Sequence, residues 1–328
     1  MTKELTQEQI NEQAEEQAEK QLKKTLKTIK DNSSTPLLEK IYSKPKEYTK
    51  MVANGNSRGF LLWGNTGLGK TFAVFRAFEE MNKEFVYLSG HITPLELYQF
   101  LFRNKDQNIV LDDVNILNDE INLNMLKSCL ADQPSIVNYN TTSPRLKVPN
   151  KFHFEGTIIL LLNSKPRLNE DLRAVEGRVL THELKLSYVD VIRVLYEISE
   201  QEYKGLTAEQ RKEIMKWLEE NTNQATECLN LRTLFQLYEM YKFDKDNWKE
   251  LAKGQIKPNI YMDLILQGIN SWNWCEETGK STATYYRYKK KAQEQKISIL
   301  PEFNEKPKAK AIEPKAVIEF EEEEIGYY

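Results

Sequence analysis

A glycine-rich stretch in the first quarter of the chain holds the residue types that bind phosphate groups. It reads Gly64-Asn65-Thr66-Gly67-Leu68-Gly69-Lys70-Thr71, which is a glycine, four residues and then Gly-Lys-Thr. Glycines let the main chain turn so that several N–H groups face phosphate oxygens, and a helix that starts there adds partial positive charge. In this spacing Lys70 reaches the β- and γ-phosphates and the Thr71 hydroxyl binds Mg²⁺. The stretch, called the P-loop below, predicts a site for a nucleoside triphosphate.

Two other apolar runs end in polar side chains that suit the same chemistry. The run from Asn108 is followed by Asp112 and Asp113, and the run from Thr157 is followed by Asn163. The carboxyl ends of parallel strands meet at one edge of a sheet, where the P-loop also opens. We expect Asp112 to hold Mg²⁺, Asp113 to orient or activate the attacking water, and Asn163 to hydrogen-bond the γ-phosphate. The alternative is that these residues merely end strands, since Asn and Asp favour turns.

The elements that must position these residues follow from the apolar pattern between residues 58 and 187. Apolar runs typical of strands alternate with stretches that have apolar residues at helical spacing. The expected strands are 59–63, 85–88, 109–111, 157–162 and 179–186, with helices at 71–81, 94–102 and 123–130 between the first four. Over residues 188–253 the pattern predicts helices only, at 188–199, 207–221 and 230–242. Alternating strands and helices predict an α/β fold, with a mainly parallel sheet covered on both faces.

The P-loop, the acid pair and Asn163, in this order along the chain, resemble the AAA+ ATPase family over residues 36–253. The resemblance implies a P-loop NTPase sheet with a helical lid, hydrolysis of ATP with Mg²⁺, and assembly into a ring of six subunits. It makes Asn163 the residue called sensor 1. In that family an arginine acts on the nucleotide of the neighbouring subunit from a position just before the last core strand. Arg178 matches this position best, and Arg173 is the second choice.

The lid carries a further motif of the same family. Leu229-Asn-Leu-Arg232 resembles the start of the sensor 2 helix, which implies that Arg232 points toward the nucleotide. GTP specificity is not expected, because the Asn-Lys-x-Asp motif that reads guanine does not occur in the sequence.

Residues 257–297 carry a positive surplus inside an acidic protein, with seven Lys and Arg against four Asp and Glu. We expect a helix at 260–269, a tight turn at Gly279, and a helix that Ser281 caps and that runs to Lys291. This pattern resembles the helix-turn-helix of plasmid and phage regulators and predicts DNA binding. The candidates for contacts with phosphates and base edges are Lys280, Thr282, Thr284, Tyr285, Arg287 and Lys289. A basic helical bundle that binds protein is the alternative.

A second basic feature lies before the strand at 157–162. Two alternating runs, 135–139 and 152–154, flank a polar stretch with Arg145, Lys147 and Lys151, and predict a β-hairpin. Three positive charges at its tip suit a phosphate backbone, although a solvated loop would look the same.

The remaining composition limits the class of protein. Apolar residues make up 40% of the chain and no apolar run reaches about 20 residues, so we expect no membrane-spanning helix. The three cysteines lack paired spacing, which argues against a disulfide framework or a zinc site and favours a reducing cytoplasm. We expect five parts: a charged helical arm at 1–35, a nucleotide-binding core at 36–187, a lid at 188–256, the helix-turn-helix at 257–297 and an acidic tail at 298–328.

Taken together, these features predict an ATP hydrolase that requires Mg²⁺ and works as a homo-oligomer on DNA. The expected role is in DNA replication, helicase loading or DNA remodelling, within a bacterial cell or a phage-infected host. The acidic tail is a candidate binding site for a protein partner. Two alternatives stay open: a protein-remodelling ATPase whose C-terminal helices recruit a client, and a regulator in which ATP only switches binding to DNA.

Overall fold

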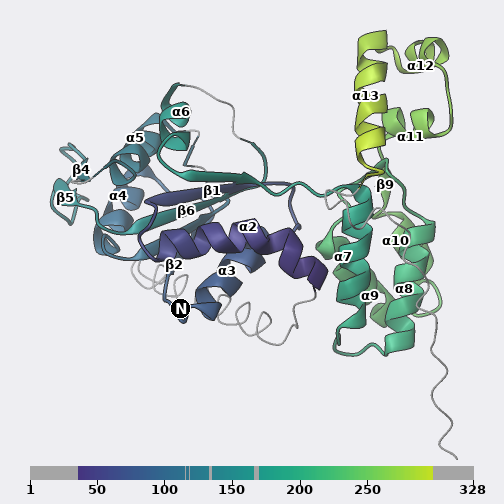
Figure 1. Cartoon of the computed structure of the whole chain (residues 1–328), viewed down its shortest axis with the longest axis horizontal. Coiled ribbons are helices and arrows are strands. Elements are labelled where there is room, and N and C mark those ends of the chain that lie inside the picture. Colours follow the sequence, from purple (N-terminus) through teal and green to yellow (C-terminus); the bar gives the residue numbers. More distant parts are fainter. Residues whose placement is uncertain (1–35, 115, 118, 133–134, 166–169, 298–328) are drawn as a thin grey trace, which may run out of the picture.

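The computed structural model describes residues 36–114, 116–117, 119–132, 135–165 and 170–297. The expected arm at 1–35 and tail at 298–328 therefore lie outside the described residues. Within the described part, Figure 1 shows an α/β region joined to a group of helices, with further helices beyond that group.

Five strands form one parallel sheet in the order β2-β3-β6-β1-β7. Their bounds are β1 Gly59–Trp63, β2 Val86–Ser89, β3 Asn108–Asp112, β6 Thr157–Leu162 and β7 Leu180–Glu183. All five expected strands occur, and β7 is shorter than the expected 179–186 because the chain leaves the sheet after Glu183. In a parallel sheet of this kind all the strand ends that were predicted to carry polar residues lie at one edge.

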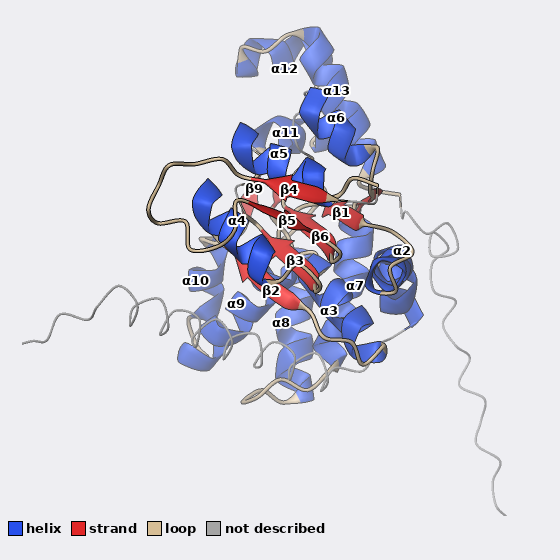
Figure 2. Cartoon of the chain, turned by 90° about the vertical axis from the view of Figure 1, so that its left-hand side faces the viewer, coloured by secondary structure: helices blue, strands red, loops and turns tan. Residues whose placement is uncertain are grey.

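The sheet is covered on both faces because alternate residues of each buried strand point to opposite sides. Phe60 and Leu62 of β1 belong to one buried apolar cluster, and Leu61 and Trp63 belong to the other. The first cluster packs under α2 Pro36–Ala53 and α3 Lys70–Glu80, and the second under α4 Pro94–Arg103, α5 Glu120–Cys129 and α6 Glu170–Glu176. Figure 2 shows helices above and below the strands. The predicted α/β class is therefore confirmed.

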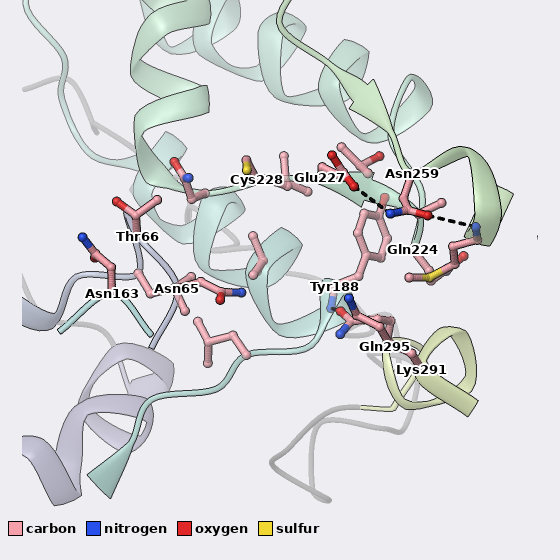
Figure 3. A pocket seen from close by; sticks show the side chains of 18 residues that line it. Asn65, Thr66, Asn163, Tyr188, Gln224, Glu227, Cys228, Asn259, Lys291 and Gln295 are labelled. Carbon is pink, nitrogen blue, oxygen red and sulfur yellow. Dashed lines mark hydrogen bonds between the residues drawn. The ribbon is translucent and has the colours of Figure 1, made fainter. Parts of the chain in front are cut away.

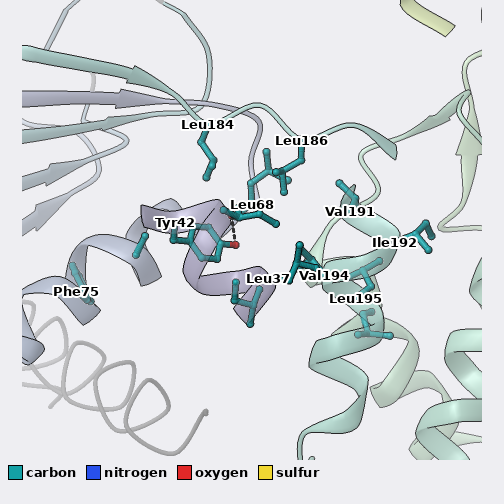
Figure 4. Close-up of a cluster of buried hydrophobic side chains, with 14 of the residues drawn as sticks. Leu37, Tyr42, Leu68, Phe75, Leu184, Leu186, Val191, Ile192, Val194 and Leu195 are labelled. Atoms are coloured by element: carbon teal, nitrogen blue, oxygen red, sulfur yellow. Dashed lines mark hydrogen bonds between the residues drawn. The ribbon is translucent and has the colours of Figure 1, made fainter. Parts of the chain in front are cut away.

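The helices after the sheet form one group, which is called the lid below. They are α7 Tyr188–Glu200, α8 Ala208–Glu220, α9 Leu231–Phe243 and α10 Trp248–Lys253. The three expected helices occur within one or two residues of their predicted bounds, and α7 and α8 each begin with a side-chain capping box. Buried residues of the lid, such as Val191 and Leu195, share one apolar cluster with the P-loop residue Leu68 (Figure 4). The lid and the sheet thus share a continuous core.

Three features depart from the expected pattern around and beyond the lid. The expectation of helices alone over residues 188–253 is wrong, because β8 Thr226–Glu227 lies in that range and pairs antiparallel with β9 Lys257–Pro258. The single helix expected at 260–269 ends earlier, since α11 spans Ile260–Leu266 and Gly268 has a φ of 90°. The stretch before Gly279 is itself a helix, α12 Ser271–Thr278, and Gly279 ends it in the left-handed conformation.

The last helix matches its prediction. Helix α13 spans Thr282–Glu294, and the Ser281 side chain accepts a hydrogen bond from the N–H of Thr284 as its N-cap. The predicted hairpin also occurs, as β4 Ile136–Asn138 paired antiparallel with β5 Lys151–His153. None of the helices in the described residues is both long enough and apolar enough to cross a bilayer.

Candidate nucleotide-binding site

The P-loop joins the end of β1 to the start of α3 at the carboxyl edge of the sheet. Gly67 and Gly69 have φ values of 73° and 79°, a region that side chains other than glycine rarely adopt. Space also demands glycine there, because an added Cβ would lie 2.5 Å from Cγ of Asn230 at Gly67 and 2.6 Å from the Tyr42 hydroxyl at Gly69. Both the shape of the loop and its close neighbours therefore require these glycines.

Lys70 lies at the start of α3 with its ammonium group folded back into the loop. Its Nζ donates to the carbonyl oxygens of Gly64 at 2.8 Å and Asn65 at 3.0 Å, and to Oδ1 of Asn163 at 3.1 Å. Burial lowers the pKa of this lysine, and the nearby carboxylates of Asp113 and Asp112 oppose that shift. Phosphate oxygens can replace these three acceptors, so the geometry suits capture of an anion.

The first acid at the end of β3 lies beside the P-loop threonine. Oδ2 of Asp112 accepts hydrogen bonds from the Thr71 hydroxyl at 2.7 Å and from the Tyr87 hydroxyl at 3.0 Å. Burial raises the pKa of Asp112, while the two hydroxyl donors favour the ionised form. A carboxylate and a hydroxyl at this distance are oxygen ligands of the kind that Mg²⁺ takes alongside nucleotide phosphates and water. The residues present therefore fit the expected ion.

The second acid and the predicted sensor residue form a pair across the sheet. Nδ2 of Asn163 lies 2.6 Å from both carboxylate oxygens of Asp113, and its Oδ1 accepts from Lys70. Asp113 has a φ of 53°, which is strained for a residue with a side chain. The side-chain amide of Asn163 thus connects Lys70 of the P-loop to Asp113, the acid expected to orient or activate the attacking water.

The lid contacts the P-loop directly. Nη1 of Arg232 donates to the Thr66 hydroxyl at 3.2 Å, and the N–H of Leu231 donates to the carbonyl of Gly67 at 3.3 Å. Asn230 caps α9 by accepting from the N–H groups of Arg232 and Thr233, and it is the side chain that lies against Gly67. The first turn of α9 is therefore fitted onto the phosphate-binding loop.

The two arginines considered for action on a neighbour lie elsewhere. Arg178 is exposed just before β7, and its Nη1 donates to the carbonyl of Lys127 on α5. Leu180 of β7 pairs with Phe60 of β1, so Arg178 lies at the amino edge of the sheet, opposite the P-loop. Five strand residues separate the two edges by about 17 Å. Arg173 is exposed on α6. The structure does not bring either arginine to the P-loop of its own chain.

Sequence reasoning missed two residues of the site. Tyr87 lies on β2, and only the register that pairs Leu88 with Leu111 brings its hydroxyl to Asp112. Asn230 was expected only as the start of a helix, yet its side chain limits the space at Gly67. A sequence signal existed for Asn230, since Asn three residues before Thr233 is an N-cap pattern. No local signal marks Tyr87.

Most of the residues expected to contact DNA lie on the exposed part of the C-terminal helices. Lys280, Thr282, Arg287 and Lys289 are exposed, and Thr284 is half-buried beside Ser281. Tyr285 is only 5% exposed, packs against Trp274, and donates its hydroxyl to the carbonyl of Ile269 at 3.1 Å. The expectation for Tyr285 is therefore wrong, because this ring forms the small core between α12 and α13. Its neighbour Tyr286 is 58% exposed instead.

The substitution Asp112→Asn distinguishes the effect of the Asp112 carboxylate on stability from its effect on ATP turnover. The folded protein raises the pKa of Asp112, so it binds this proton more tightly than the unfolded chain does, and the stabilising contribution of the group falls as pH rises through that pKa. Above that pKa the ionised carboxylate therefore contributes less to the free energy of unfolding than the protonated group does below it. We expect Asp112→Asn to raise the Tm of the nucleotide-free protein while lowering Mg²⁺-dependent ATP turnover by at least about 100-fold. Thermal unfolding at pH 5 and pH 8 and a phosphate-release assay check this; a lower Tm at both pH values contradicts it.

Comparisons with known proteins add the following. No protein-family model matches the chain. It is 28% identical over 229 residues to an uncharacterised 36.7 kDa protein from the nrdC–mobD intergenic region of Enterobacteria phage T4, covering 63% of this chain and 70% of that one. Solved structures similar to it include the Holliday junction branch migration motor RuvB of Thermotoga maritima, at 14% identity, with a TM-score of 0.44 over 76% of this chain and 86% of that chain. Another is AMPPCP-bound DnaA of Aquifex aeolicus, at 16% identity, with a TM-score of 0.42 over 82% and 91%.

The fold itself can be named from the chain's own topology. The sheet has the order β2-β3-β6-β1-β7, and the P-loop follows β1, between β6 and β7. Asn163 follows the adjacent strand β6, and the acids lie at the end of β3, on the other side of β6. A helical lid follows the last strand and places Arg232 on the P-loop. This chain has the fold of the AAA+ ATPases.

Proposed function

We propose that the chain binds ATP with Mg²⁺ and hydrolyses it. The observation that carries the proposal is the set of contacts that links Thr71 to Asp112 and links Lys70 through Asn163 to Asp113. Each group has a use in phosphoryl transfer and they meet at one edge of the sheet, beside a loop whose glycines cannot be replaced without collision.

The roles follow from the chemistry of each side chain. Thr71 and Asp112 would hold Mg²⁺, and the bound ion would supply positive charge next to the phosphates. Lys70 exchanges its three oxygen partners for β- and γ-phosphate oxygens. Nδ2 of Asn163, which donates to Asp113, turns to donate to the γ-phosphate instead. Asp113 then orients the attacking water and accepts its proton. Arg232 supplies a further positive charge from the lid.

Oligomerisation belongs to the same proposal. Phosphoryl transfer gains from a cation that meets the γ-phosphate as negative charge develops there. Arg178 is too far from the P-loop of its own chain to do this, since it lies at the opposite edge of the sheet. It is exposed, so it can meet the P-loop of a second copy. We propose a homo-oligomeric ring, with six subunits as the family resemblance implies.

The target of the proposed ATPase is DNA. The C-terminal unit at 257–297 has a positive surplus of three charges, and its α12–turn–α13 arrangement leaves Lys280, Arg287 and Lys289 exposed. Trp274 packs against Tyr285 and Tyr288 of α13 and so fixes the position of this helix. A helix that enters the major groove of DNA needs such a fixed position. We propose a motor or loader in DNA replication or remodelling, within a bacterial cell, and the relative in phage T4 supports a phage setting.

The domain division is part of this proposal. A nucleotide-binding core at 36–187 and a lid at 188–256 form the ATPase, and 257–297 forms the DNA-binding unit. The apolar cluster that the core and the lid share supports treating them as two parts of one ATPase unit.

The test is ATP hydrolysis measured alone, with single-stranded DNA and with double-stranded DNA. We expect DNA to raise the turnover of the wild type, Lys70→Ala to abolish turnover, and Arg287→Ala to remove most of the stimulation while leaving the basal rate intact. Lys212→Ala, on the exposed face of α8, serves as the control for an unrelated basic residue. Full turnover by Lys70→Ala contradicts the ATPase assignment.

Two other results would redirect the proposal to the alternatives. Turnover that no DNA changes, equal in wild type and Arg287→Ala, favours a protein client recruited by the C-terminal helices. Tight ATP binding with negligible turnover favours a regulator that ATP switches on DNA.

A further inference from the structure

A cavity of about 420 Å³ runs from the P-loop to the C-terminal helices (Figure 3). At one end it is lined by Asn65, Thr66 and Asn163 of the site described above. At the other end Lys291 and Gln295, from the end of α13, close it. The volume lies in the range of pockets that hold small ligands. The cavity therefore connects the phosphate-binding loop with the unit proposed to bind DNA.

The lining of the cavity changes character along its length. Its middle is apolar, with Leu68, Leu186 and Val191 on the wall. Its far end is polar and uncharged for the most part, with the amides of Gln224 and Gln295 beside Lys291. Apolar walls suit the faces of an aromatic base, and amides suit the donors and acceptors on its edge. The end at Thr66 suits phosphates.

The end of α13 is fastened to the chain that connects the sheet to the lid. Oε1 of Gln295 accepts a hydrogen bond from the N–H of Tyr188 at 2.7 Å. Nζ of Lys185 forms an ion pair with Oε2 of Glu294 at 3.5 Å. Ala292 packs in a small buried cluster with Met262 and with Ala225 of the lid. The connecting chain, residues 184–187, is itself held to the end of β1 by the N–H of Leu184, which donates to the carbonyl of Trp63 at 2.7 Å.

We propose that the nucleoside half of the bound nucleotide lies in this cavity and contacts Lys291 and Gln295, so that α13 takes part in nucleotide binding. The proposal rests on the proposed function, since it assumes that the P-loop holds the phosphates. It adds a specificity role for a helix that the sequence assigned to DNA alone. Lys291 and Gln295 are one helical turn apart and both line the cavity. Lys290 and Gln293 are exposed, as Lys291 is, but they do not line the cavity.

The geometry also couples the two ends of α13. The helix has 13 residues, which corresponds to a length of about 20 Å. Its C-terminal end meets the lid and its Ser281-capped end points away from the lid (Figure 1). A nucleotide that touches the inner end therefore biases the orientation of the outer end, and a ligand bound at the outer end changes nucleotide affinity by the same factor.

The experiment compares ADP with inorganic pyrophosphate as ligands of the full chain, both with Mg²⁺, by titration calorimetry. ADP carries the nucleoside and pyrophosphate does not. We expect Lys291→Ala and Gln295→Ala each to weaken ADP binding about tenfold, which corresponds to loss of one charged or amide contact, and to leave pyrophosphate binding unchanged. The matched controls Lys290→Ala and Gln293→Ala bind both ligands as the wild type does.

The outcomes separate this inference from the proposed function. A wild type that binds neither ligand refutes the proposed function, and the inference with it. Binding by the wild type, lost in Lys70→Ala, together with unchanged ADP affinity in Lys291→Ala and Gln295→Ala overturns the inference alone. Equal weakening of ADP and pyrophosphate overturns it as well, because the residues would then not contact the nucleoside.

Hydrogen exchange of the wild type provides the second measurement. Exchange of backbone amides in residues 282–290 slows when ADP binds and not when pyrophosphate binds, if α13 senses the nucleoside. If the backbone amides of residues 282–290 exchange at the same rate with and without ADP, the proposed coupling between the two ends of α13 is wrong.

Discussion

Asp113→Asn is expected to lower ATP turnover by about 100- to 1,000-fold while nucleotide affinity stays within about threefold of the wild type. The carboxylate of Asp113 accepts from Nδ2 of Asn163, and in the proposed reaction it orients water and takes its proton. Asparagine keeps the size of the side chain and loses the ability to accept that proton. Steady-state phosphate release and a separate binding titration distinguish the two effects.

A control for Asp113→Asn comes from another aspartate of the same region. Asp106 is exposed before β3, where it pairs with Lys105, so Asp106→Asn removes a charge near the sheet without touching the site. Turnover in Asp106→Asn should match the wild type. If Asp113→Asn also keeps wild-type turnover, a residue other than Asp113 orients the attacking water and accepts its proton.

Arg178→Ala is expected to lower turnover by about 1,000-fold or more, again with nucleotide binding intact, because arginines that meet the γ-phosphate contribute on that scale. Arg178 lies at the amino edge of the sheet, so its target is the site of a second subunit. Arg173→Ala is the matched variant, since Arg173 is also exposed and lies on the preceding helix. We expect Arg173→Ala to keep most of the turnover. Phosphate release by each purified variant measures this difference.

Mixing two inactive variants tests whether Arg178 acts between subunits. A Lys70→Ala subunit keeps Arg178, and an Arg178→Ala subunit keeps an intact P-loop, so their mixed oligomers contain some complete sites. Turnover should appear on mixing and depend on protein concentration. A mixture no more active than its parts would show that Arg178 does not serve a neighbour.

The sheet could be predicted from the sequence because its strands are short apolar runs separated by helices of clear period. Helix α2 was not predicted, because Pro45 lies inside it and interrupts the apolar pattern. The helix nevertheless buries Leu37, Leu38 and Ile41 of its own sequence in the core. Helix α12 was missed because its apolar content consists of Trp272, Trp274 and Cys275, of which Trp274 alone is fully buried. Periodicity reveals a helix only when several apolar residues share one face.

The candidate site divides in the same way. Lys70, Thr71, Asp112, Asp113 and Asn163 could be predicted because each follows the end of an apolar run in a recognisable order. The contacts that join them depend on tertiary structure, because strand register, lid position and helix direction arise from residues far apart in the chain. Tyr87 and Asn230 therefore emerged only with the structure, as did the wall of the cavity that α13 supplies.

The core claim is that the P-loop binds the phosphates of a nucleotide with Lys70 as the main cation. Titration calorimetry with Mg²⁺ and a non-hydrolysable ATP analogue measures this directly, with wild type, Lys70→Ala and the exposed control Lys212→Ala. We predict a Kd between about 1 µM and 1 mM for wild type and Lys212→Ala. We predict affinity at least about 50-fold weaker for Lys70→Ala, because three oxygen acceptors show that its ammonium reaches the loop. Wild-type protein that binds no nucleotide, or Lys70→Ala that binds as tightly as wild type, would contradict the account.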